Sequence, residues 1–140
     1  MAKPSWQTIK QVVYERANGC CEYCSTAEIN IGQTLHIEHI VLDTGDKLEN
    51  LCLACPNCNV SKAAATTAVD PETNVTVQLF HPRHQSWADH FAWSEDFSEI
   101  FGLTPVGRAT ISRLKMNRPR IVLARQRWVQ AGYHPVVQKS

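Results

Sequence analysis

The chain has 140 residues, of which 44% are hydrophobic and 19% are charged, as in a single globular domain rather than a disordered chain. No apolar run approaches the ~18 residues that cross a bilayer. The N-terminus also lacks the apolar stretch of a secretory signal, so we expect a cytoplasmic protein with no membrane partner. Because cytosolic cysteines stay reduced, the six cysteines indicate metal binding or redox chemistry rather than disulfides.

The net charge of +1 hides an uneven distribution along the chain. Residues 1–99 carry all 13 acidic residues and six bases, whereas residues 100–140 carry eight bases and no acidic residue. A basic segment of this kind fits a contact with a phosphate backbone. It fits equally well a solvated helix face that pairs with the acidic first part of the chain. Charge alone leaves both interpretations open.

The first part of the chain predicts a helix, a short strand, an apolar run and a second helix. Apolar residues at spacings of three and four predict a helix over residues 5–17. A short strand is expected over residues 35–42, and a second apolar run occupies residues 50–54. Residues 55–65 can form a turn that opens into an alanine-rich helix.

The second part predicts a small hairpin and two helices. Alternation of apolar and polar residues predicts the first strand, while Thr104-Pro105 and Gly132 supply the start and stop signals of helices. The expected elements are a strand over residues 75–79, a partner strand over residues 87–93, a helix from Thr104 that stops near Arg118-Pro119, and a helix over residues 120–131.

Two Cys-x-x-Cys pairs, Cys21/Cys24 and Cys55/Cys58, are separated by 30 residues. Each pair can direct two thiolates at one ion, and Zn²⁺ takes four tetrahedral ligands. The four cysteines therefore predict a structural zinc site. Cys20 and Cys52 are expected to take no part in it.

The insert between the two pairs has its own order of residues. It reads Leu35-His36-Ile37-Glu38-His39-Ile40, then Gly45, then Asn50-Leu51, and Asn59 and Lys62 follow the second pair. This order resembles the HNH endonuclease family, in its branch with two zinc knuckles. The core motif covers residues 21–65. Asn59 stands where many members have His, so the site resembles the H-N-N variant.

The resemblance implies an α+β fold with a ββα-metal (His-Me finger) core. The four-cysteine zinc site would hold this core together, with flanking helices and a small extra β-hairpin around it. One HNH domain would occupy residues 1–140, with a basic helical extension over residues 104–132. The implied activity is hydrolysis of DNA phosphodiester bonds, as a nick or a double-strand cut.

The resemblance also implies a role for each residue of the motif. His39 would be the general base, since histidine titrates near neutral pH. Glu38 and Asn59 would hold a catalytic divalent ion, Mg²⁺ or Mn²⁺, through oxygen atoms. Asn50 would brace the loop, and Lys62 would face the phosphate.

Further contacts with nucleic acid are expected from a few side chains. His36, Arg83 and Arg108 join Lys62 as candidates, although a structural role for His36 and for Arg83 stays open. His81, His84 and His90 have no spacing that demands a metal and are expected to be structural. The sequence leaves open whether RNA is also cut, and cleavage of both strands would need two nicks or a homodimer.

Two other classes of protein carry zinc knuckles. The main alternative is a non-catalytic module that binds nucleic acid or protein, for which zinc matters and His39 does not. A redox or zinc-storage protein is the third. The set of Glu38, His39, Asn50, Asn59 and Lys62 favours the nuclease, because a module that only binds has no need of these residues together.

Overall fold

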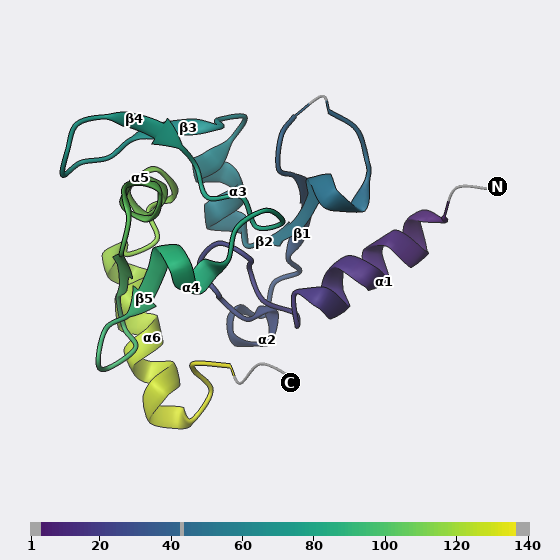
Figure 1. The fold of residues 1–140 in the computed structure, drawn as a ribbon. Helices are drawn as coiled ribbons and strands as arrows, with labels where there is room; N and C mark the ends of the chain where they lie inside the picture. Colours follow the sequence, from purple (N-terminus) through teal and green to yellow (C-terminus); the bar gives the residue numbers. More distant parts are fainter. Residues whose placement is uncertain (1–3, 43, 137–140) are drawn as a thin grey trace.

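A computed structural model describes residues 4–42 and 44–136 of the chain (Figure 1). Asp43, which belongs to the expected turn, and Lys139 of the basic segment lie outside the described residues. The elements in chain order are α1 (Trp6–Arg16), α2 (Glu28–Ile31), β1 (His36–His39), the 3₁₀ helix η1 (Leu48–Asn50), β2 (Leu51–Ala54), α3 (Pro56–Lys62), β3 (Thr67–Val69), β4 (Thr76–Gln78), α4 (Trp87–His90), β5 (Phe91–Trp93), β6 (Ile100–Gly102), α5 (Pro105–Leu114) and α6 (Pro119–Ala131). None of the helices in the described part combines the length and apolar character that a membrane span requires.

Strands β1 and β2 and helix α3 form a ββα unit. The two strands are antiparallel, with Glu38 opposite Cys52 and His39 opposite Leu51. All four residues of β2 are buried, and the chain enters α3 directly after them. The α+β architecture with a ββα core, expected from the sequence, is confirmed.

Capping residues define the helix ends that the sequence predicted. The Ser5 side chain accepts a hydrogen bond from the Thr8 backbone N–H, which starts α1. Thr104 does the same for Gly107 at the start of α5. Gly132, with φ of 81°, ends α6 in the left-handed conformation that glycine tolerates. Helix α5 ends at Leu114, earlier than the Arg118-Pro119 stop that was expected, because Lys115 turns left-handed.

The structure has two extra hairpins, and the predicted pairing of residues 75–79 with residues 87–93 is wrong. Strand β4 pairs with β3, and β5 pairs with β6. The segment Trp87–His90 is the short helix α4. A tight turn joins β3 to β4, where the Asp70 carboxylate accepts hydrogen bonds from the Glu72 N–H and the Thr73 hydroxyl. These hydrogen bonds stabilise the turn and so favour the pairing of β4 with the strand that precedes it.

Helix α5 connects the ββα unit to both extra hairpins. It contacts α3, the β3–β4 hairpin and β6, and Figure 1 shows it beneath β3 and β4. Helix α6 is anchored by Arg125, which is buried and donates hydrogen bonds to the backbone carbonyls of Ser98 and Met116. These contacts hold α5, α6 and the extra hairpins in place around the ββα unit.

Candidate active site and metal centre

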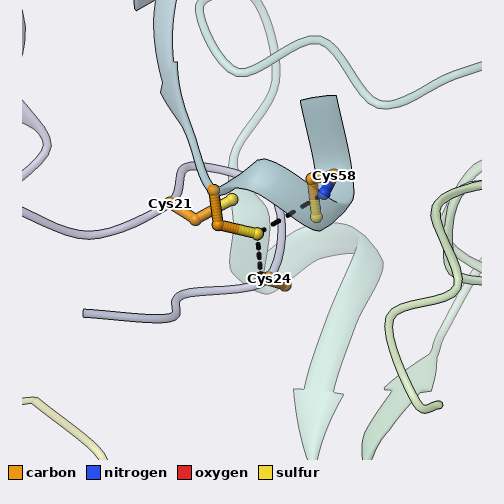
Figure 2. A group of neighbouring side chains, drawn as sticks. Cys21, Cys24 and Cys58 are labelled. Carbon is orange, nitrogen blue, oxygen red and sulfur yellow. Dashed lines mark hydrogen bonds between the residues drawn. The ribbon is translucent and has the colours of Figure 1, made fainter. Parts of the chain in front are cut away.

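Four buried cysteines converge on one point between two segments. Cys21 and Cys24 come from the turn between α1 and α2, while Cys55 and Cys58 come from the junction of β2 and α3. Their sulfur atoms all lie within 4.8 Å of one another, and Figure 2 shows the side chains turned toward a common centre. Four sulfurs at about 2.3 Å from a tetrahedral ion would be about 3.8 Å apart. The Cys24 and Cys55 sulfurs are 3.6 Å apart, so the cluster fits a metal ion.

Local hydrogen bonds favour the thiolate form of Cys24 in this cluster, whereas burial raises the pKa of Cys21 and hydrogen bonds with the other thiols raise that of Cys58. The Cys55 sulfur is the N-cap of α3 and accepts a hydrogen bond from the Cys58 backbone N–H at 3.4 Å. The Thr26 hydroxyl lies 3.1 Å from the Cys24 sulfur. Hydrogen bonds from Cys21 and the other cluster thiols, with Thr26, hold the pKa of Cys24 well below that of an ordinary thiol. A deprotonated sulfur is the form that binds metal.

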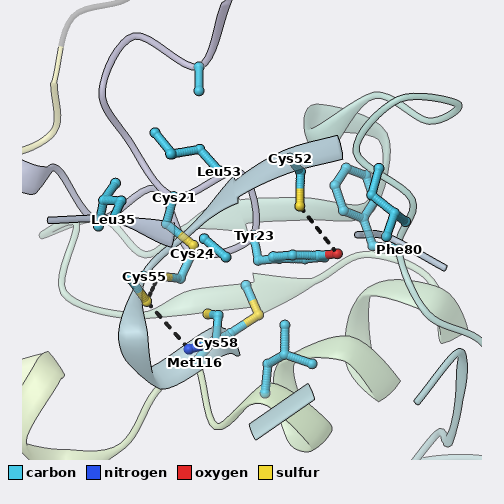
Figure 3. Close-up of a cluster of buried hydrophobic side chains, with 14 of the residues drawn as sticks. Cys21, Tyr23, Cys24, Leu35, Cys52, Leu53, Cys55, Cys58, Phe80 and Met116 are labelled. Atoms are coloured by element: carbon cyan, nitrogen blue, oxygen red, sulfur yellow. Dashed lines mark hydrogen bonds between the residues drawn. The ribbon is translucent and has the colours of Figure 1, made fainter. Parts of the chain in front are cut away.

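The two remaining cysteines lie outside the four-cysteine cluster. Cys52 is fully buried on β2, and its thiol points to the Tyr23 hydroxyl at 3.8 Å (Figure 3). Burial raises the pKa of Cys52 to about 11, so this thiol is protonated near neutral pH. Cys20 is also buried, and burial raises its pKa.

A small pocket beside the cluster brings together four of the five predicted motif residues. Glu38 and His39 reach it from the end of β1, while Asn59 and Lys62 reach it from successive turns of α3. Adjacent strand residues normally point to opposite faces, but β1 ends at His39, so both side chains can line one pocket. Cys58 and Tyr23 also line the pocket and connect it to the four-cysteine cluster.

The fifth motif residue, Asn50, lies outside the pocket lining and acts on the backbone instead. Its side-chain oxygen accepts a hydrogen bond from the Val41 N–H at 2.9 Å. Its amide donates to the carbonyls of Val41 at 3.0 Å and Gly45 at 2.8 Å. Three hydrogen bonds from one buried side chain fix the path of the loop that leaves β1.

Asp46 is a neighbour of His39 that sequence reasoning missed. Its carboxylate oxygen is 2.6 Å from His39 Nε2, although 79% of the Asp46 side chain is exposed. A carboxylate accepts hydrogen bonds, so this contact assigns the proton of a neutral His39 ring to Nε2. Nδ1 then carries the lone pair. The only signal in the sequence was an aspartate next to the Gly45 turn, which is too common to single out.

Lys62 is more buried than expected. Only 7% of the residue is exposed, and its ammonium group donates a hydrogen bond to the Ile40 carbonyl at 2.8 Å. Burial lowers the pKa of Lys62. The side chain therefore forms a wall of the pocket and ties α3 to the end of β1, rather than extending into solvent.

The predicted contacts with nucleic acid are dispersed. His36 is exposed on β1. The Arg83 guanidinium is paired with Glu22, and burial lowers the pKa of Arg83 to about 10. Arg108 binds both oxygens of the buried Asp70 carboxylate at 3.0 and 2.9 Å. Neither arginine lines the pocket of Glu38 and His39, and their ion pairs fit a structural role.

Comparison with known proteins places this site in a family. Residues 21–64 match the model of the HNH endonuclease family. The matched segment contains the four clustered cysteines and all five motif residues, so the predicted resemblance is confirmed. No curated protein and no solved structure shows significant similarity to the chain. An HNH domain indicates a nuclease or a nucleic-acid-binding function.

Proposed function

We propose that this chain, whose residues 21–64 form an HNH endonuclease domain, is a metal-dependent nuclease that hydrolyses phosphodiester bonds of DNA. One observation carries the proposal. Glu38, His39, Asn59 and Lys62 line a single pocket directly beside the four-cysteine cluster. A base, two oxygen ligands and a cation are what phosphodiester hydrolysis requires.

The ion of the reaction would be held by Glu38 and Asn59. Their side chains offer a carboxylate and an amide oxygen, the ligand type that Mg²⁺ and Mn²⁺ prefer. Both line a pocket whose volume of about 10 Å³ is sufficient for one small group. When bound, the ion would polarise the phosphate and stabilise the leaving oxygen.

His39 would act as the general base. With the Nε2–H directed at Asp46, its Nδ1 accepts a proton from the attacking water. The water oxygen bonds to phosphorus, the bond from phosphorus to the 3′ oxygen breaks, and that oxygen takes up a proton. The products are 5′-phosphate and 3′-hydroxyl ends. Asp46 is a positioning residue in this scheme, because it acts through His39.

Zinc is the metal we assign to the four-cysteine cluster. Four thiolates complete its tetrahedral shell and leave no position for water, so its role would be structural. It would join the turn at Cys21–Cys24 to α3, which carries Asn59 and Lys62. Lys62 would then hold the end of β1 against α3, and Asn50 would brace the loop that follows β1.

The partner would be duplex DNA, and its phosphate backbone would lie along exposed basic side chains of the protein. Arg108 and Arg125 of the C-terminal segment are engaged by protein groups. Arg113 also donates hydrogen bonds to the Ser61 and Lys62 carbonyls. The exposed basic side chains that are candidates for phosphate contact are Lys115, between α5 and α6, and Arg120 and Arg127 of α6. The extensive contacts of α5 with α3 support one functional domain that includes residues 104–132. A cut through both strands would need two successive nicks or a homodimer.

A supercoiled plasmid tests the proposal against the binding-only alternative. Wild type and His39→Ala, both checked for bound zinc, are incubated with Mg²⁺ or Mn²⁺, and DNA binding is measured in parallel. We expect wild type to nick the plasmid and the zinc-loaded variant to bind without nicking. If neither protein nicks and both bind, the chain is a non-catalytic zinc-knuckle module. If both nick equally, the assigned site is wrong.

A further inference from the structure

The pocket of Glu38 and His39 is too small for its substrate. Its volume of about 10 Å³ corresponds to about one water molecule. An ion, a water or a phosphate oxygen fits there, but a nucleotide does not. The sugar and base next to the scissile phosphate must therefore lie on an adjoining surface.

A larger groove adjoins this pocket. It has a volume of about 270 Å³, and Lys62 lines both cavities. Ile40 and Val41, which follow His39 directly, form one side of the groove. A still larger cavity of about 380 Å³, beside Trp87 and Trp93, has no lining residue in common with the pocket. Of these two cavities, the groove is the one that shares a lining residue, Lys62, with the pocket of Glu38 and His39.

The other lining residues of the groove come from the β3–β4 hairpin and the segment after it. Thr66 and Gln78 lie at the base of this hairpin, where the Thr66 carbonyl accepts a hydrogen bond from the Leu79 N–H. The Phe80 N–H donates to the Thr110 hydroxyl on α5 at 2.9 Å. These bonds hold the groove in shape before any ligand arrives.

His81 presents a hydrogen-bond donor at the edge of the groove. Its Nδ1 accepts the backbone N–H groups of Arg83 at 3.2 Å and His84 at 3.3 Å. The proton of the neutral ring is therefore on Nε2. Burial, with the nearby charges of His84 and Lys62, lowers the pKa of His81 and favours that neutral form.

We propose that this groove, defined by Lys62, Thr66, Gln78 and His81, binds the nucleotide next to the scissile phosphate. The inference rests on the proposed nuclease function and deepens it. The Lys62 ammonium uses one of its three N–H groups on Ile40, which leaves two for phosphate oxygens. His81 and Gln78 offer polar groups to the sugar or base edge. Val41 and Leu79 supply apolar contacts for the faces of the sugar and the base.

Binding and cleavage are tested separately. In a His39→Ala background, which prevents cutting, the affinity for a labelled duplex is compared with and without His81→Ala or Gln78→Ala. Each second substitution should weaken binding about fivefold, the effect of one lost hydrogen bond. His84→Ala is the matched control, because His84 is exposed, stacks on His81 and does not line the groove. It should change the affinity less than about twofold.

Two substrates then separate the groove from the catalytic pocket. With His39 restored, His81→Ala should raise KM for duplex DNA but leave hydrolysis of bis(p-nitrophenyl) phosphate, which lacks a nucleotide, unchanged. Oligonucleotides shortened on one side of the cut would show which neighbour occupies the groove. The proposal is overturned if His81→Ala and Gln78→Ala both leave the affinity for DNA unchanged. It is also overturned if His81→Ala lowers the activity on duplex DNA and on bis(p-nitrophenyl) phosphate equally. If wild type hydrolyses neither substrate, the nuclease function fails, and the affinities still decide whether the groove binds nucleic acid.

Discussion

At the scale of the residue, the contact between His39 and Asp46 sets the tautomer of the side chain that we propose as the general base. The 2.6 Å separation fixes the ring orientation and leaves Nδ1 available for the water proton. An amide at position 46 has both an acceptor oxygen and a donor NH₂ group, so it can also pair with the His39 tautomer that has its proton on Nδ1. The carboxylate also stabilises the imidazolium that forms during the reaction.

Asp46→Asn should therefore lower the cleavage rate without lowering affinity for DNA. We expect a loss of about tenfold to 100-fold in the single-turnover rate, less than the roughly 10²–10⁴-fold that a positioned base itself contributes, because Asp46 acts through His39. Rapid-quench cleavage of a labelled duplex measures this rate, and a filter-binding assay measures affinity. Glu49→Gln is the matched control, since it removes an exposed carboxylate from the same loop. Equal rates in wild type and Asp46→Asn would remove Asp46 from the mechanism.

The motif residues could be located from the sequence because their order is local. The Cys-x-x-Cys pairs are turns of fixed length. Glu38 and His39 lie at the end of β1, and Asn59 lies within α3. Asp46 could not be predicted, because no spacing rule links an exposed loop aspartate to a strand histidine. The burial of Lys62 was missed for a different reason: a long lysine side chain can reach either solvent or the backbone.

At the scale of the element, the pair of Asp70 and Arg108 joins the β3–β4 turn to α5. The buried Asp70 carboxylate receives two bonds from the guanidinium, which holds the pKa of Asp70 well below its usual range. A carboxyl group with a depressed pKa in the folded state stabilises the fold above its unfolded pKa near 4. This contribution is lost as the pH falls through the folded value.

Asp70→Asn should consequently be less stable than wild type at pH 7, with a Tm lower by about 4 °C or more. The difference should shrink below about pH 4, because the carboxyl group takes up a proton there in the unfolded chain but stays charged in the folded one. Thermal unfolding of both proteins at several pH values measures this. Glu72→Gln, which removes a largely exposed carboxylate from the same turn, is the control and should have a small effect. A difference that is constant with pH would exclude the ion pair as its cause.

Helix α5 closely approaches the end of α4 and strand β6 at Gly107. A Cβ atom there would lie 2.0 Å from the His90 carbonyl oxygen, so the backbone would have to move. Gly107→Ala should therefore destabilise the fold by about 1–3 kcal/mol or more. Urea unfolding measures the loss, with Ser112→Ala on an exposed position of the same helix as control. A stable Gly107→Ala protein would contradict this packing.

Element boundaries were easier to predict than element pairing. Thr104 and Gly132 act on the adjacent backbone, so the helix start and stop that they set could be predicted directly. Strand pairing depends on the turns between strands and on packing contacts between residues far apart in the sequence. The β3 strand has only three residues in an alanine- and threonine-rich segment, which gave no strand pattern. Its absence from the prediction left β4 without its actual partner.

At the scale of the whole molecule, the four-cysteine centre connects segments that are far apart in the chain. It joins the turn after α1 to α3, and α3 packs against α5. A bound ion would stabilise all of these together, because metal binding in such a site is coupled to folding. The catalytic pocket lies against the same cluster through Cys58 and Tyr23.

Cys58→Ser should lose the bound zinc and lower the Tm by about 10 °C or more, since three thiolates and a hydroxyl hold zinc poorly. Cleavage should be lost as well, because α3 carries Asn59 and Lys62. Cys20→Ser is the matched control: it alters a buried cysteine outside the cluster and should retain one zinc per chain. Elemental analysis and thermal unfolding measure both effects. Full zinc content in Cys58→Ser would refute the assigned ligands.

The measurement that tests the central claim most directly is chemical rescue of His39→Ala. Removal of the side chain leaves space in the site for free imidazole, which can replace a missing base if the reaction needs one there. We expect the zinc-loaded variant to cleave a labelled duplex in Mg²⁺ only when imidazole is added, with a rate that rises with its concentration. Cleavage by His39→Ala at the wild-type rate without imidazole would contradict the assignment of His39 as the general base.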